Sequence, residues 1–119
     1  MLTPLQITFR HMFPSENVEV KIREKVKHLY HLYENILGCK VLLDFHKYSY
    51  SGKVFQIEIM LSLPDEKIVV SREFRLGKIE ENNYCAIQDA FEASRKQLKG
   101  YTRRQLHMRT PVLASELQQ

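Results

Sequence analysis

The chain has 119 residues, of which 44% are hydrophobic and 27% charged, a balance that indicates one globular domain and excludes a disordered chain. Eighteen lysines and arginines against fourteen acidic residues give a net charge of +4 and a pI of about 9.1, so the chain is mildly basic. No apolar run approaches the roughly 20 residues that a membrane span requires, and we expect no membrane partner. The two cysteines, Cys39 and Cys85, fit no metal or redox spacing, and we interpret them as reduced, buried thiols of a cytoplasmic protein.

The chain begins with a predicted strand and a predicted helix. Leu5–Arg10 alternates apolar and polar residues, which is the period of a half-buried strand. Ser15 is a candidate N-cap for a helix that ends near Gly38. The apolar residues of this helix recur every three or four positions: Val18, Ile22, Val26, Leu29, Tyr33 and Ile36.

Three strands are predicted next, joined by turns at 49–52 and 64–66. In the first, Cys39–Tyr48, the residues Val41, Leu43 and Phe45 share one face, and Lys40, Asp44 and His46 share the other. The second has the clearest alternation, with Phe55, Ile57, Ile59, Leu61 and Leu63 on its apolar face. In the third, Ile68–Arg75, Arg72 interrupts the apolar row.

A linker, 77–81, leads to a predicted helix over Asn82–Arg104, with Asn82 or Asn83 as its cap. An apolar stripe is formed by Tyr84, Ile87, Phe91 and Leu98. The second half is strongly basic, and no acidic residue occurs from Ala93 through Ser115. This charge serves either a negatively charged partner or only the helix dipole and solubility.

The order β-α-β-β-β-α predicts an α+β fold, a two-layer sandwich in which both helices pack on one face of a four-stranded sheet. The first strand is expected to pair in parallel at an edge, because a helix connects it to the next strand. Residues 1–105 form the predicted domain and 106–119 a flexible C-terminal tail.

No constellation for catalysis is visible, so we expect no enzyme, no cofactor and no metal. His28 and His31 have a spacing compatible with metal, but no third ligand is near in sequence and lysines surround them. His11 and His46 have no sequence neighbour that suggests acid–base chemistry. Cys85 lies in the predicted first turn of a helix, where a reactive thiol is one interpretation and a small core residue the other.

A positive surface across the two helices is the remaining candidate. Its predicted members are Lys21, Arg23, Lys25 and His28 on the first helix, and Arg95, Lys96, Lys99, Arg103 and Arg104 on the second. Phosphate backbones are the commonest target of such a surface. Tyr30 and Tyr101 either stack on bases there or pack in the core.

Several segments together resemble the ribosome hibernation-promoting factors, also called ribosome-associated inhibitor A or ribosomal subunit interface proteins, in their short form. The resemblance covers about residues 5 to 104. It rests on the element order and on Lys25-Val-Lys-His28-Leu29, Val41-Leu-Leu43, Asn83-Tyr-Cys-Ala-Ile87 and Lys96-Gln-Leu-Lys99.

The resemblance implies binding to the small ribosomal subunit and its rRNA, in the channel for messenger and transfer RNA, with translation silenced in stationary phase or stress. Lys25, His28, Lys96 and Lys99 match basic positions of the family, whereas Glu19 and Ala93 replace basic ones. Ribosome dimers formed with a second factor stay open, and no small-molecule substrate is implied. Two alternatives also stay open: a general structured-RNA binder, and a protein–protein adaptor that uses the open sheet face.

Overall fold

The computed structural model describes residues 4–48, 52–75 and 79–109, with side chains over 4–46, 54–74 and 85–106. Six elements follow in the predicted order. They are β1 (Leu5–Arg10), α1 (Glu16–Leu32), β2 (Gly38–Tyr48), β3 (Gly52–Ser62), β4 (Lys67–Arg75) and α2 (Ile79–Arg109).

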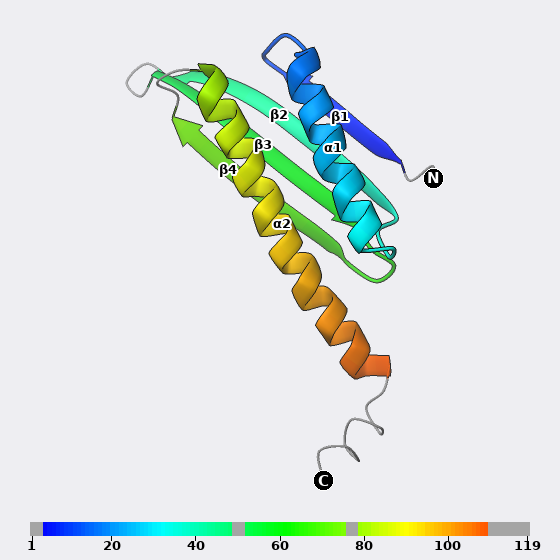
Figure 1. The fold of residues 1–119 in the computed structure, drawn as a ribbon. Helices are drawn as coiled ribbons and strands as arrows, with labels where there is room; N and C mark the ends of the chain where they lie inside the picture. The colour runs from blue at the N-terminus through cyan, green and yellow to red at the C-terminus, as the bar shows by residue number, and fades with distance from the viewer. Residues whose placement is uncertain (1–3, 49–51, 76–78, 110–119) are drawn as a thin grey trace.

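The strands form one four-stranded sheet in the order β1-β2-β3-β4. The edge strand β1 pairs in parallel with β2, and Arg10 lies beside Asp44 in this register. The β2–β3 and β3–β4 pairs are antiparallel. Figure 1 shows α1 and α2 side by side on one face of the sheet and running in the same direction. The predicted two-layer α+β sandwich is confirmed.

The core lies between the sheet and the helices. Along β3, Phe55, Ile57, Ile59 and Leu61 are each fully buried, as strict alternation predicts. They meet the helix stripes, represented by Ile22 of α1, which is 0% exposed. Burial of a large aliphatic side chain contributes roughly 1.5–3 kcal/mol, so this double layer is the main source of stability.

Arg72 occupies the inner row of β4, beside Ile57 of β3. Its Nε lies 3.0 Å from Oδ2 of Asp89 on α2. The cation in the apolar row therefore reaches the covering helix and pairs with a carboxylate there.

The helix α1 begins as predicted, because the Ser15 hydroxyl accepts a hydrogen bond from the backbone N–H of Val18 at 3.4 Å. The predicted end near Gly38 is wrong: α1 ends at Leu32, and Tyr33 has extended backbone angles. Tyr33 and Ile36 lie in the connection after α1 and pack on the core from there. Their spacing therefore matches the helical period although they are not in the helix.

The prediction for the start of α2 is also wrong. The helix begins at Ile79, so Asn82 and Asn83 lie within it and do not cap it. The rest of the predicted linker, 77–78, lies outside the described residues, as do 49–51 of the predicted turn.

At its other end α2 continues to Arg109, four residues beyond the predicted domain limit of 105. Figure 1 shows this last part of the helix extending past the end of the sheet. Residues 110–119 of the predicted tail lie outside the described residues.

Candidate nucleic-acid interface

A hydrogen bond joins the two helices on their solvent-facing side, and one of its partners is a predicted site residue. Lys25 of α1 donates from Nζ to Oε1 of Gln88 on α2, at 3.1 Å. The pKa of Glu92 on α2 is held below its usual value, first by a hydrogen bond from Arg95 and by the charge of Arg95, and further by the charges of Lys96 and Lys25. Cations of both helices therefore lie close enough to Glu92 to lower its pKa. Lys25, Arg95 and Lys96 thus share one surface.

The groove between the first halves of the helices is lined by charges of both signs. Lys21 lines it, but three carboxylates do so as well: Glu24, Asp89 and Glu92. The three carboxylates weaken the attraction of this groove for phosphate, so the unpaired positive charge of α2 lies farther along the helix, after Glu92.

Three of the predicted cations are engaged in ion pairs. Arg95 pairs with Glu92 at 2.7 Å, and this pairing raises the pKa of the guanidinium. Arg23 pairs with Glu19 at 2.9 Å. Arg104 reaches Glu66, in the turn between β3 and β4, at 3.3 Å. These pairs are exposed, so a stronger anion can still compete for the arginines.

The second half of α2 keeps the cations that face solvent. Lys96, Lys99 and Arg103 are exposed, and no ion pair to them occurs within the described part of the chain. Their spacing of three and four places them along one strip of the helix. His28, exposed on α1, and half-exposed Lys21 and Lys25 are the counterparts on the neighbouring helix.

The two tyrosines are buried to different degrees: Tyr101 lies in the core, and Tyr30 is half-buried against it. Tyr101 is 2% exposed and its hydroxyl donates to Oδ1 of Asp65 at 2.8 Å. Tyr30 donates to the backbone oxygen of Pro4 at 2.9 Å, on the side of α1 next to β1, and burial raises the pKa of its hydroxyl. Packing, the alternative interpretation, describes both residues.

The two positions that depart from the family's basic pattern have local explanations. Glu19 forms the ion pair with Arg23 described above. Ala93 is half-buried and packs against the hydrophobic core, so it lies at the edge of the buried face of α2. The cations available on α2 therefore begin one turn later, at Lys96.

The prediction that both thiols are buried holds for one of them. Cys39 is 3% exposed, and burial raises the pKa of its thiol to about 12. Cys85 is exposed on α2, where it lines the groove beside Gln88. Since α2 begins at Ile79, Cys85 lies in the second turn and on the face opposite the sheet, which explains why it is not a core residue.

A cluster of polar residues was missed by the sequence analysis. His11 and His46, for which no partner was predicted, both contact the carboxylate of Asp44, at 2.9 Å and 3.1 Å. Arg10 pairs with the same carboxylate at 3.0 Å. The sequence predicts a parallel pairing for the first strand but not its register, and it is the register that places Arg10 beside Asp44.

The chain is similar to known proteins over most of its length. The family model described as Sigma 54 modulation protein / S30EA ribosomal protein matches residues 5–106. A search of curated proteins finds no match. No helix in the described part of the chain is long and apolar enough to cross a membrane.

Among solved structures, the chain is similar to a ribosomal subunit interface protein from Coxiella burnetii, with a TM-score of 0.64 and 15% identity over 82% of this chain and 96% of that one. It is also similar to the N-terminal domain of Protein Y from Thermus thermophilus, with a TM-score of 0.62 and 19% identity over 84% of this chain and 99% of that one. At these identities the similarity establishes the fold.

Proposed function

This chain belongs to the Sigma 54 modulation protein / S30EA ribosomal protein family, the ribosome-associated family of subunit interface and hibernation proteins, and on that premise we propose that it binds the small ribosomal subunit. The contact is made by the exposed cations of α2 and α1 with the phosphates of rRNA. The bound domain occludes the channel for messenger and transfer RNA and silences translation in stationary phase or stress. The protein acts in the cytoplasm, without catalysis and without a small-molecule substrate.

The observation that carries this proposal is the strip Lys96–Lys99–Arg103. Its three side chains are exposed on the helix face opposite the sheet, and no carboxylate pairs with them within the described residues. Cations without partners lose least when they exchange water and counterions for phosphates, and the release of counterions supplies much of the affinity. Beyond the strip, α2 continues to Arg109 and extends past the end of the sheet (Figure 1).

Lys21, Lys25 and His28 of α1 form the second half of the proposed contact. Lys25 lies nearest to α2, as its hydrogen bond to Gln88 shows. Arg23, Arg95 and Arg104 contribute only after they leave Glu19, Glu92 and Glu66. We therefore rank them below the strip on α2.

Co-sedimentation with purified ribosomes tests the proposal. The double variant Lys96→Glu, Lys99→Glu is expected to lose binding to the small subunit by tenfold or more, since two attractive contacts become repulsive. The matched control is Lys40→Glu, Lys67→Glu, which makes the same change in net charge on the opposite face of the sheet, where both lysines are exposed. The control is expected to bind like the original protein.

Equal loss in the two double variants would show that total charge, and not the helix strip, determines binding. A competition experiment distinguishes the proposed function from general RNA binding. A general RNA binder would be displaced from ribosomes by naked hairpin RNA at a similar concentration. The adaptor on the open sheet face predicts the reverse pattern. Substitution of Val69, which is 49% exposed there, would weaken binding, and reversal of the lysines on α2 would leave it unchanged.

A further inference from the structure

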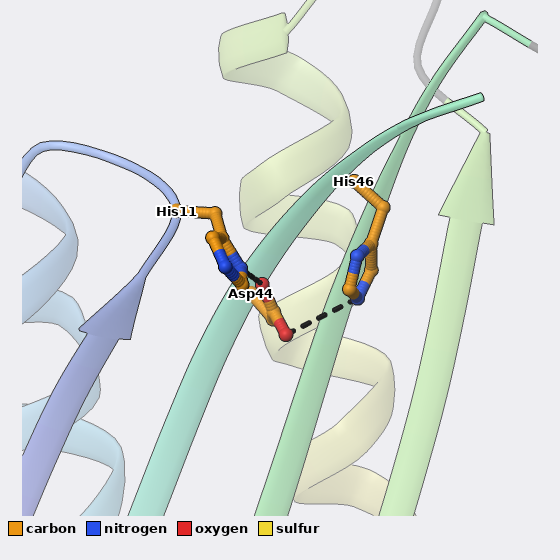
Figure 2. A group of neighbouring side chains, drawn as sticks. All are labelled: His11, Asp44 and His46. Atoms are coloured by element: carbon orange, nitrogen blue, oxygen red, sulfur yellow. Dashed lines mark hydrogen bonds and ion pairs between the residues drawn. The ribbon is translucent and has the colours of Figure 1, made fainter. Parts of the chain in front are cut away.

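The face of the sheet that the helices leave open carries a compact group of three side chains. Asp44 and His46 are two residues apart on β2, so both project to the same side of the strand. His11 directly follows β1, the strand that pairs with β2. Figure 2 shows the two imidazoles on either side of the Asp44 carboxylate, with the ribbon of α2 behind the sheet.

The three residues already have the spacing of a metal site. Nδ1 of His11 lies 2.9 Å from one oxygen of Asp44, and Nε2 of His46 lies 3.1 Å from the other. The ligand atoms that the three residues offer all lie within 4.8 Å of one another. Around a tetrahedral zinc ion with ligands at about 2.0–2.2 Å, neighbouring ligand atoms are about 3.4 Å apart. Binding an ion would require the side chains to rotate so that one ligand atom of each points at the same position.

The carboxylate in this group is buried, which is unusual for an aspartate on an open sheet face. Asp44 is 1% exposed. Its burial acts to raise the pKa, but hydrogen bonds from His11 and Arg10 and the nearby charges of His46 and Arg10 outweigh burial and lower the pKa below its usual value. The group therefore holds a buried carboxylate between two imidazoles.

We propose that His11, Asp44 and His46 form a binding site for a divalent transition-metal ion, with Zn²⁺ the best match to the ligands. Two imidazoles and one carboxylate are a known ligand set for zinc with an open fourth position for water. Magnesium and calcium prefer oxygen ligands, so two nitrogens select against them.

The positive charge of Arg10 would repel a bound cation, and this repulsion lowers the expected metal affinity of the site. Its side chain is 54% exposed, so solvent screens part of its charge. Its guanidinium bonds one oxygen of Asp44 through Nε and a terminal nitrogen, each at 3.0 Å, and in the metal-bound form it would hold the carboxylate in place. The site is therefore weaker than a structural zinc site of four uncharged or anionic ligands.

A bound ion would fix the turn after β1 to β2. His11 has a φ of 58°, a backbone conformation that few residues other than glycine adopt, and its side chain contacts Asp44 on β2. The site lies on the sheet face opposite the helices. Metal binding and ribosome binding are therefore independent, and either can fail without the other.

Metal titration of chelator-treated protein tests the site. We expect one equivalent of Zn²⁺ by calorimetry, and Co²⁺ as a probe to give the visible absorption of a four- or five-coordinate ion. His11→Gln and His46→Gln should each weaken Zn²⁺ binding tenfold or more while circular dichroism reports an unchanged fold. The melting temperature should rise with Zn²⁺ in the original protein and not in these variants.

The control is the double variant His28→Ala, His31→Ala, which removes the pair of histidines on α1 that has metal-compatible spacing in the sequence. It should bind Zn²⁺ like the original protein. Absence of stoichiometric binding in the original protein would overturn the proposal, and so would binding that survives the glutamine variants and is lost in the double variant.

Discussion

The carboxylate of Asp44 has four polar partners. Arg10, His11, His46 and the backbone N–H of Phe45 all contact its carboxylate. Hydrogen bonds to a charged group contribute about 1.5–3 kcal/mol each, and their loss leaves buried groups unpaired. This single side chain therefore joins β1, the turn after it and β2.

We expect Asp44→Asn, in metal-free buffer, to lower the free energy of unfolding by about 1–3 kcal/mol at pH 7. The pKa of Asp44 is lowered in the folded protein, so its contribution is complete above the unfolded pKa of about 3.9 and disappears as the pH falls through the folded value. The difference between variant and original should therefore shrink below about pH 4. Urea unfolding at pH 7 and pH 3 measures it.

Glu73→Gln, an exposed residue on β4, is the control for loss of one negative charge and should change stability little at either pH. A deficit of Asp44→Asn that is equally large at pH 3 would show that shape, and not charge, explains the effect.

This residue also shows where reasoning from sequence stops. Asp44 and His46 were correctly placed on the polar face of one strand, but their partners Arg10 and His11 lie more than 30 positions earlier. Only the parallel register of β1 with β2 joins them, and a local pattern does not contain that register. The ion pairs of the predicted cations show the same limit. Two of them are local on a helix, Arg23 with Glu19 and Arg95 with Glu92, and their spacing is visible in the sequence. The third joins Arg104 to Glu66 in a distant turn, which no local pattern indicates.

The elements themselves follow from periodicity, because one face of each strand and helix is buried. The alternation in β3 and the stripe in α1 both appear as buried residues. The helix ends were predicted less well. At the end of α1, Tyr33 and Ile36 satisfy the helical period from outside the helix, since core packing selects apolar residues in a connection as it does in a helix.

The helix α1 has a buried face and an exposed face, and a substitution on each can be compared. Ile22 is 0% exposed and lies between helix and sheet, whereas Val20, two residues earlier, is 52% exposed. Ile22→Ala should cost about 2–5 kcal/mol, through lost apolar contact and the cavity that it leaves. Val20→Ala should cost less than about 0.5 kcal/mol. Chemical denaturation of the two variants measures both, and similar losses would contradict the assignment of the buried face.

At the scale of the whole molecule, the two faces of the sheet differ in kind. One is covered by two helices that direct exposed cations away from the sheet, and the other carries the His11–Asp44–His46 cluster on open strands (Figures 1 and 2). The net charge of +4 says little about this separation, because ion pairs on the helices cancel several cations. An RNA partner responds to the cations that remain without a carboxylate, and the strip Lys96–Lys99–Arg103 supplies three of them among the described residues.

That count can be measured through the salt dependence of ribosome binding. With about six phosphate contacts and about 0.7 counterions released for each, log K should fall against log salt with a slope of about −4. Lys96→Gln combined with Lys99→Gln removes two contacts, so the slope should become less steep by about 1.4. Lys40→Gln with Lys67→Gln, on the open sheet face, should leave it unchanged. Binding constants from sedimentation at four or five salt concentrations give these slopes, and an equal slope for the α2 variant would mean that its lysines do not contact phosphate.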